Sequence, residues 1–258
     1  YGFVFAGEDE NKEQYVFKFS RINLPQHVQD RLEEEADIQQ QLVHSRIPRV
    51  IEYRKIKRQS ILQMMRAPGV DLERYSKLHG PLSPELIVNI TIQLGEILGY
   101  LRDPRQHPSG KPYVHGDIKP SNIIYDEQTG KVYLIDWGSS VTAQLDIYGQ
   151  TTSTNVMDLM SSDLQNTNAR LGDVYFIGPE QIDGQMSSPR FDEQGLAATI
   201  YALASGQSCR YPLLPLCFAL CSPWICILSS VIGASMHHSS CVVKIRTRVN
   251  PMSIAGGG

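Results

Sequence analysis

Residues 115–122, His-Gly-Asp-Ile-Lys-Pro-Ser-Asn, and the Asp-Trp-Gly of residues 136–138 decide the fold of this chain. The two segments place an aspartate, a lysine, an amide and a second aspartate within a short stretch of sequence. Magnesium prefers oxygen ligands, and a phosphoryl group in transfer needs its negative charge neutralised. The pattern therefore predicts a site that holds a nucleoside triphosphate with its metal ion and aims a hydroxyl at the terminal phosphate.

Each residue of this set has one expected role. Asp117 is expected to accept or orient the hydroxyl proton, and Lys119 to steady the transferred phosphate. Asn122 and Asp136 are expected to bind Mg²⁺ through oxygen.

The segment between these residues predicts a β-hairpin. Apolar runs at 123–125 and 132–135 flank a polar turn at 126–131, which is the pattern of two paired strands. Such a hairpin would return Asp136 to the side of Asn122 and so close the metal site.

At these positions the chain resembles the protein kinase superfamily, whose catalytic loop reads H-R-D-x-K-x-x-N and whose metal loop reads D-F-G. Residues 15–18 resemble the strand that carries the ATP-binding lysine, here Lys18. Residues 33–38 resemble the helix whose glutamate, here Glu35, pairs with that lysine.

The resemblance continues downstream and covers residues 1–206. Gly-Pro-Glu at 178–180 stands where the family has A-P-E, and Phe191-Asp192 opens a helical run to Ser205 that resembles the helix anchoring the catalytic loop. Lys119, two residues after the catalytic aspartate, resembles the serine/threonine class rather than the tyrosine class.

The resemblance implies ATP and Mg²⁺ as cofactors. Met65 and Ala67 are expected to bind adenine through their backbone, and Asp71 to reach the ribose. The full set of implied cofactor-binding residues is Gly2, Val4, Val16, Lys18, Glu35, Met64, Met65, Ala67, Asp71, Ile124 and Asp136. Gly2 and Val4 match only the second half of a glycine-rich phosphate loop, so we expect a partial loop here.

The implied fold is α+β and bilobal, with a small β-rich lobe over residues 1–66 that contains one main helix. A hinge over 65–71 leads to a larger, mostly helical lobe over 72–206. Helical spacing supports this order. One face is formed by Val28, Leu32, Glu35, Gln39 and Leu42, and a second apolar stripe by Leu86, Ile90, Leu94, Ile97, Leu98 and Leu101.

Two alternatives to a protein kinase stay open from the sequence. Gly116 and Trp137 resemble the H-G-D and I-D-W elements of aminoglycoside and choline phosphotransferases, which act on small molecules. The second alternative is a pseudokinase that binds nucleotide or a partner without transfer. Asp173 stands where a threonine is common near the catalytic aspartate, and a carboxylate there could pair with Lys119 or repel Asp117.

Composition gives weaker constraints. The chain has 258 residues with a net charge of −3, which offers no broad basic field for nucleic acid. All five cysteines follow residue 208, as a cytoplasmic kinase domain would allow. The expected partner is a protein substrate with a serine or threonine hydroxyl, and no oligomeric state is specified.

The last part of the chain, residues 207–258, does not fit the kinase pattern. Residues 211–243 contain no Lys, Arg, Asp or Glu, and 213–234 are apolar enough to be considered a membrane span. The segment is interpreted as a span, as a divergent remnant of the large lobe, or as sequence foreign to the fold. In each case the large lobe is expected to be incomplete.

Overall fold

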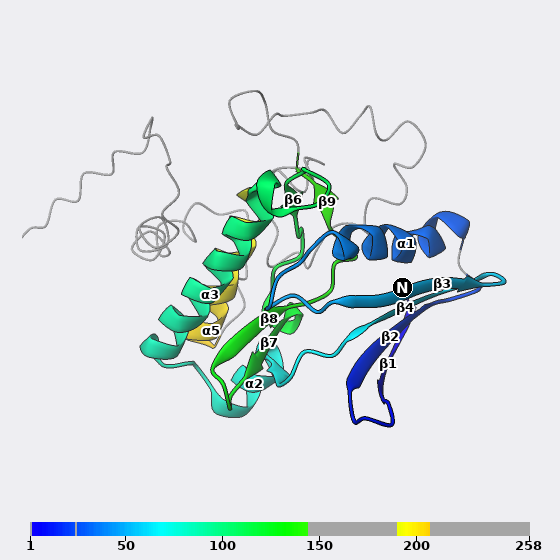
Figure 1. The fold of residues 1–258 in the computed structure, drawn as a ribbon. Helices are drawn as coiled ribbons and strands as arrows, with labels where there is room; N and C mark the ends of the chain where they lie inside the picture. Colours follow the sequence, from blue (N-terminus) through cyan, green and yellow to red (C-terminus); the bar gives the residue numbers. More distant parts are fainter. Residues whose placement is uncertain (1, 24, 144–189, 207–258) are drawn as a thin grey trace, which may run out of the picture.

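The computed structural model describes residues 2–23, 25–143 and 190–206 of the chain. These residues form a β-rich small lobe and a mostly helical large lobe (Figure 1). The predicted bilobal α+β architecture is therefore confirmed over the described residues.

The small lobe is an antiparallel sheet with one helix packed on it. Its strands are β1 (Gly2–Glu8), β2 (Gln14–Ser20), β3 (Val50–Ile56) and β4 (Gln59–Met65), arranged in the order β1-β2-β4-β3. Helix α1 (Gln26–Gln40) lies across one face and contacts β2, β3 and β4 (Figure 1).

Alternation along β2 decides which side chains meet α1. Val16 packs with buried Ala36 and Leu62, and Lys18, two residues on, reaches Glu35 on the helix. On α1 the predicted face is confirmed for the residues whose side chains are described: Leu32 is partly buried, and Glu35 and Gln39 are buried. Leu42 is also buried, but it lies beyond the end of the helix at Gln40, so its predicted place on the helix face is wrong. The side chain of Val28 lies outside the described part of the structure.

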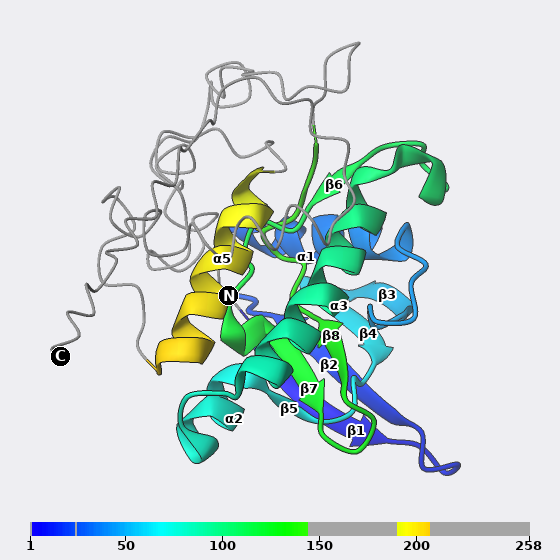
Figure 2. The ribbon, with the colours of Figure 1, turned by 90° about the vertical axis from the view of Figure 1, so that its left-hand side faces the viewer.

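The large lobe contains α2 (Leu72–His79), α3 (Pro84–Arg102) and α5 (Arg190–Ser205). Helices α3 and α5 lie side by side in both ribbon views (Figures 1 and 2). Helix α3 begins at a serine cap, because the Ser83 hydroxyl accepts a hydrogen bond from the backbone N–H of Leu86. Its apolar stripe forms the main core with α5 and the hairpin.

Short strands line the region between the lobes. The predicted hairpin is confirmed as β7 (Ile123–Asp126) and β8 (Lys131–Leu134), and β5 (Val70–Asp71) pairs with β7. Two further short strands, β6 (Tyr113–Val114) and β9 (Val141–Thr142), pair with each other. The 3₁₀ turns η1 (Pro104–Gln106) and η2 (Pro120–Asn122) follow α3 and precede β7.

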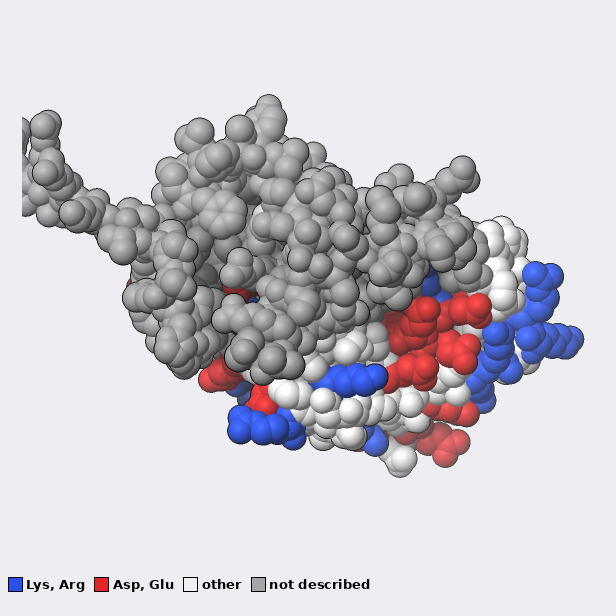
Figure 3. Space-filling view, turned by 90° about the horizontal axis from the view of Figure 1, so that it is seen from above, with Lys and Arg blue, Asp and Glu red and all other residues white. Residues whose placement is uncertain are grey.

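The surface of the small lobe is divided by charge. The exposed side of α1 carries Glu33, Glu34 and Asp37, and basic side chains gather beside this acidic row (Figure 3). Across the described ranges, no helix has the length and apolar character to cross a membrane. The predicted span at 213–234, the Gly-Pro-Glu element and Asp173 lie outside the described residues.

Candidate active site

The loop that begins at His115 is held by a carboxylate from α5. The Oδ2 atom of Asp192 accepts a hydrogen bond from the backbone N–H of His115 at 2.8 Å, and its Oδ1 accepts from Gly116 at 2.9 Å. Burial raises the pKa of the Asp192 carboxyl, while His115 and the two backbone N–H groups act in the opposite direction. The expected anchoring of the catalytic loop by this helix is confirmed.

His115 connects this loop to the metal loop. Its Nδ1 accepts from the backbone N–H of Asp117 at 3.2 Å, so the neutral tautomer has its proton on Nε2, which lies 3.1 Å from the Ile135 carbonyl oxygen. The imidazole also makes an edge contact with Trp137, with ring centroids 4.7 Å apart. The two motifs are therefore packed against each other.

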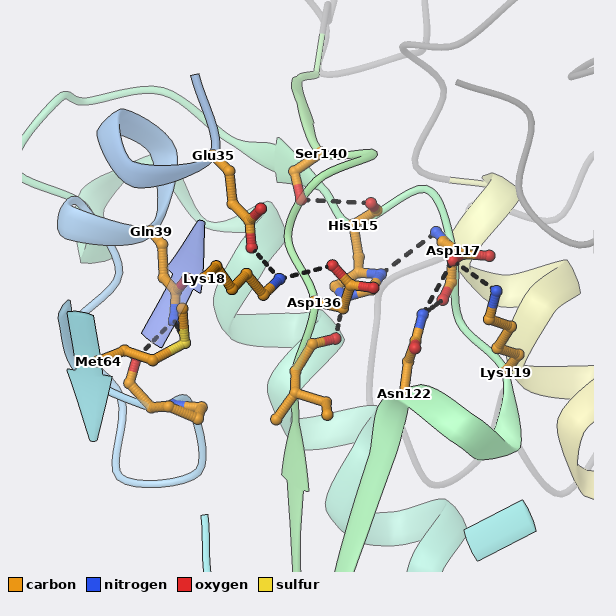
Figure 4. Close-up of polar contacts among 12 residues, drawn as sticks. Lys18, Glu35, Gln39, Met64, His115, Asp117, Lys119, Asn122, Asp136 and Ser140 are labelled. Atoms are coloured by element: carbon orange, nitrogen blue, oxygen red, sulfur yellow. Dashed lines mark hydrogen bonds and ion pairs between the residues drawn. The ribbon is translucent and has the colours of Figure 1, made fainter. Parts of the chain in front are cut away.

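The three residues predicted as catalytic converge on one carboxylate (Figure 4). The Asn122 amide Nδ2 donates to both the backbone oxygen and Oδ2 of Asp117, each at 2.9 Å. The Lys119 Nζ lies 2.9 Å from the same Oδ2. Asp117 is thus oriented by an amide and a cation from its own loop.

A second cluster joins the two lobes (Figure 4). Lys18 Nζ lies 2.5 Å from Glu35 Oε1 and 2.8 Å from Asp136 Oδ1. Lys18 and Glu35 are only 16% and 6% exposed, respectively, whereas Asp136 is 49% exposed. The predicted pairing of Lys18 with Glu35 is confirmed.

Burial and neighbouring charges shift the pKa values of this cluster in opposite directions. Burial alone would lower the pKa of Lys18, but the carboxylates of Glu35 and Asp136 raise it above its ordinary value. Burial raises the pKa of Glu35, with Lys18 opposing. The pKa of Asp136 is lowered, because Lys18 outweighs the effect of burial. Lys18 and Asp136 are both charged at neutral pH.

The backbone around Asp136 fits a metal ligand. Asp136 has a φ of +67°, which non-glycine residues adopt rarely and often at functional sites. The Ile135 N–H donates to the Asn122 carbonyl at 3.0 Å, which brings the metal loop alongside η2. Because the Asn122 amide nitrogen is used by Asp117, its oxygen is the atom left for a cation.

Two oxygen ligands suit magnesium, which keeps several waters and binds substrate phosphates. Within residues 2–23, 25–143 and 190–206 there is no group of three or more His, Cys, Asp or Glu that could hold a metal ion by itself. Asn122 and Asp136 could together offer two oxygen ligands to such an ion.

Sheet register groups some of the other predicted nucleotide residues in pairs. Val4 is paired with Lys18, and Val16 with Met64, which is buried against Ala36 and Leu62. In the large lobe, Asp71 is paired with Ile124 across β5 and β7.

Hydrogen bonds within the protein limit which atoms of the hinge could contact a nucleotide. The Met65 N–H donates to the Arg49 carbonyl at 2.9 Å, so an adenine contact through this residue has to use its carbonyl oxygen. Asp71 Oδ1 accepts from Arg74 N–H at 2.8 Å and caps α2, which leaves Oδ2 for a ribose. Ala67 is partly buried between these two residues.

The structure gives a reason for glycine at residue 2 that the sequence did not indicate. It lies in β1 opposite Ser20, and a Cβ built on it would come within 2.2 Å of the Phe19 carbonyl oxygen. Glycine is therefore required by the neighbouring strand, whether or not a phosphate approaches.

Other residues that position the site are not assigned by the sequence. Asp192 is predicted only as part of a helix start, and no role is predicted for Gln39. The Gln39 amide donates to the Pro48 carbonyl at 2.7 Å and lies 3.8 Å from the Met64 sulfur. The sequence does contain one signal for this role: Gln39 is a polar residue on the buried face of α1, one turn after Glu35.

Comparison with known proteins identifies a family for most of the chain. The family model described as the protein kinase domain matches residues 1–211. Serine/threonine-protein kinase PknD of Mycobacterium tuberculosis is 27% identical over 208 residues, which are 79% of this chain and 26% of that protein.

Two further relatives match about half of the chain. Serine/threonine-protein kinase PrkC of Bacillus subtilis is 27% identical over 54% of this chain, and serine/threonine-protein kinase F of Synechocystis is 29% identical over 55%. The matched segments are 18% and 24% of those proteins, so the chain spans at most about a quarter of the length of these relatives.

Proposed function

The chain belongs to the protein kinase family, and from this premise we propose that it transfers the γ-phosphate of ATP to serine or threonine hydroxyls of proteins. The observation that carries the proposal is the carboxylate of Asp117, held by Asn122 and Lys119 in a loop that α5 anchors. A positioned carboxylate of this kind can act as a general base or orient a hydroxyl.

In the proposed reaction, the substrate hydroxyl oxygen forms a bond to the γ-phosphorus while the bond from that phosphorus to the ADP oxygen breaks. Asp117 takes or directs the hydroxyl proton. Lys119, 2.9 Å from Asp117, is close enough to neutralise charge on the transferred group. Positioning and charge neutralisation are the main requirements of phosphoryl transfer.

The nucleotide and metal assignments remain part of the proposal. Asn122 and Asp136 would hold Mg²⁺, which when bound supplies charge neutralisation on the phosphates. Lys18, kept cationic by its two carboxylates, would contact the phosphates from the small lobe.

The remaining cofactor contacts are proposed from register and backbone geometry. Val4, Val16 and Met64 would line the adenine side, and Ile124 the opposite wall. The Met65 carbonyl and the Ala67 backbone would bind adenine, and Asp71 the ribose.

A protein substrate is favoured over a small alcohol. The curated relatives that match this chain are named serine/threonine-protein kinases. Lys119 stands two residues after Asp117, where the serine/threonine class has its lysine.

The test is phosphate transfer from labelled ATP to histone H1 or casein, compared with transfer to choline and aminoglycosides. We expect Asp117→Asn to reduce protein labelling by about 100-fold or more, because a positioned base contributes at least this much. Asp37→Asn, an exposed residue of α1, makes the same chemical change outside the site and should leave labelling unchanged.

Three outcomes would contradict the proposal. Labelling that persists in Asp117→Asn would exclude this residue as the base. Transfer to small alcohols alone would favour the phosphotransferase alternative, and nucleotide binding without any turnover would favour a pseudokinase.

A further inference from the structure

The free end of the small-lobe sheet carries a group of cations and apolar side chains that the proposed reaction does not use. We call this group the basic tip and define it as Arg21, Ile22, Ile56, Lys57 and Arg58. It consists of the turn between β3 and β4 together with the residues that follow β2. Figure 1 shows this turn projecting at the end of the sheet away from the large lobe.

Hydrogen bonds bring the two segments of the tip together. The Ser60 N–H donates to the Ser20 hydroxyl at 2.8 Å, and the Gln59 amide donates to the Ser20 carbonyl at 3.3 Å. Lys57 forms the turn with a φ of +57°. These hydrogen bonds hold residues 21–22 and the turn at 56–58 at the same end of the sheet, where the Arg21 guanidinium lies 4.9 Å from the centroid of the Phe3 ring.

The apolar members of the tip are both more than half exposed. Ile22 is 59% exposed and Ile56 is 52% exposed, and both are next to cations in the sequence. Exposure of an apolar side chain to water does not stabilise the fold. An apolar group rimmed by charge indicates an interaction surface.

The cations of the tip carry positive charge that nearby acids do not cancel. Over the described residues, Arg21, Lys57 and Arg58 make no ion pair with a carboxylate. The two cations that precede the tip in β3 do have acidic partners, because Arg54 lies 3.6 Å from Glu52 and Lys55 lies 3.5 Å from Asp30. The net positive charge is therefore concentrated at the extreme end of the sheet.

We propose that the basic tip binds the surface of an anionic lipid bilayer. The cations would contact lipid phosphates and carboxylates, and the two isoleucines would enter the interfacial region. The acidic row on α1, beside the tip in Figure 3, would be repelled by the same surface. The domain would therefore approach end-on, with the sheet end toward the lipid.

A broad anionic surface fits the positions of the five tip residues better than an acidic peptide does. Both edge strands of the sheet, β1 and β3, have one end beside the tip, and an acidic peptide that paired with either would run along that one side of the sheet. A peptide paired with β3 would not reach Arg21 and Ile22, because these residues follow β2, on the other side of β4. A peptide paired with β1 would not reach residues 56–58, because β2 and β4 lie between β1 and β3. A flat anionic surface contacts all five residues at once. This inference is independent of residues 213–234 and of the proposed reaction.

The test measures how much phosphatidylserine strengthens binding of the full chain to vesicles. Affinity for phosphatidylcholine vesicles with about 30% phosphatidylserine is divided by affinity for pure phosphatidylcholine vesicles, so that apolar binding by residues 213–234 cancels. The contribution of Lys244, Arg246 and Arg248 is the same in every variant and cancels when the ratios of variant and wild type are compared. Lys57→Asn combined with Arg58→Gln should reduce this ratio by about 30-fold, since each cation contributes about 1 kcal/mol near such a surface. Asparagine tolerates the positive φ of residue 57.

Matched controls separate the tip from overall charge. Lys111→Asn combined with Lys131→Gln removes two exposed lysines of the large lobe and should leave the ratio nearly unchanged. Ile56→Ser should weaken binding to the anionic vesicles by about tenfold, because an apolar anchor is lost. High salt should reduce the wild-type ratio.

The proposal is overturned if the tip variant keeps the wild-type ratio or if both double variants lower it equally. It is also overturned if the chain ignores phosphatidylserine but binds poly-L-glutamate through the tip in fluorescence anisotropy, which would identify an acidic protein as the partner. Thermal unfolding of each variant checks that it is folded.

Discussion

Gly116 illustrates how one residue can be fixed by backbone geometry at the candidate site. It has a φ of +81°, and a Cβ built on it would lie 2.7 Å from the Ser139 carbonyl oxygen. The family commonly has arginine here, so the sequence alone indicates the loss of a phosphate clamp. The structure adds that any side chain at this position must displace the segment that follows the metal loop.

We therefore expect Gly116→Ala to lower the free energy of unfolding by about 2–3 kcal/mol, from the left-handed backbone and the close contact together. Gly110→Ala is the matched control, because Gly110 has a φ of +65° but no atom within 4 Å of the position that a Cβ would take. That variant should lose only about 1 kcal/mol. Denaturant unfolding of both measures the difference, and equal losses would show that the Ser139 contact is relieved at no cost.

At the scale of elements, two helix caps allow a site role to be separated from a structural one. Asp71 caps α2 and Ser83 caps α3, each by accepting a backbone hydrogen bond. Replacing either with alanine should cost about 1 kcal/mol of stability. Only Asp71→Ala should also raise the KM for ATP, since only Asp71 is proposed to contact the ribose. An unchanged KM in steady-state assays would remove Asp71 from the nucleotide site.

His44, in the connection between α1 and β3, is predicted to make the stability of the fold depend on pH. Burial, with Arg46 adding to it and Glu96 opposing, lowers the pKa of His44 below its ordinary value of 6.5. His44 Nδ1 also accepts from the Arg46 N–H at 3.2 Å, which requires the unprotonated nitrogen. The unfolded chain thus binds the proton more readily, so stability should fall as the pH drops below about 6.5.

Thermal unfolding of wild type and His44→Gln at about pH 7.5 and pH 5.5 tests this assignment. The wild type should lose more stability on acidification than the variant does. Parallel losses in the two proteins would assign the acid sensitivity to other groups.

The elements that could be predicted from the sequence are those with local signals. The hairpin of β7 and β8 has its turn residues between two apolar runs, and α3 has its serine cap and proline before a periodic stripe. The anchoring of His115 by Asp192 joins residues 77 positions apart, and Tyr100 accepts from the Val43 N–H across 57 positions. Such contacts depend on how elements pack, and no local pattern encodes them.

The same distinction holds within the candidate site. Lys18, Glu35, Asp117, Lys119, Asn122 and Asp136 could be found because their spacing matches known motifs. The bond from Met65 to Arg49 and the packing of Gly2 against Phe19 could not be found in this way, because they depend on the register of the sheet.

For the whole molecule, the two lobes meet through the bond between Lys18 and Asp136, so a ligand that contacts both should stabilise the assembly. With ATP and Mg²⁺ at about 100 times the dissociation constant, we expect about 2.7 kcal/mol of added stability, measured as a rise in Tm. Asp136→Asn should remove the part of this rise that depends on Mg²⁺, whereas Asp37→Asn should keep it. A shift that is the same with and without Mg²⁺ in the wild type would contradict the metal assignment.

The anchor supplied by α5 also bears on how the chain matures during synthesis. A nascent polypeptide that has emerged only as far as residue 143 already contains Lys18, Glu35, Asp117, Asn122 and Asp136, but not the carboxylate that grips the backbone of His115 and Gly116. The reactive loop can therefore reach its final geometry only after the ribosome has released residue 192.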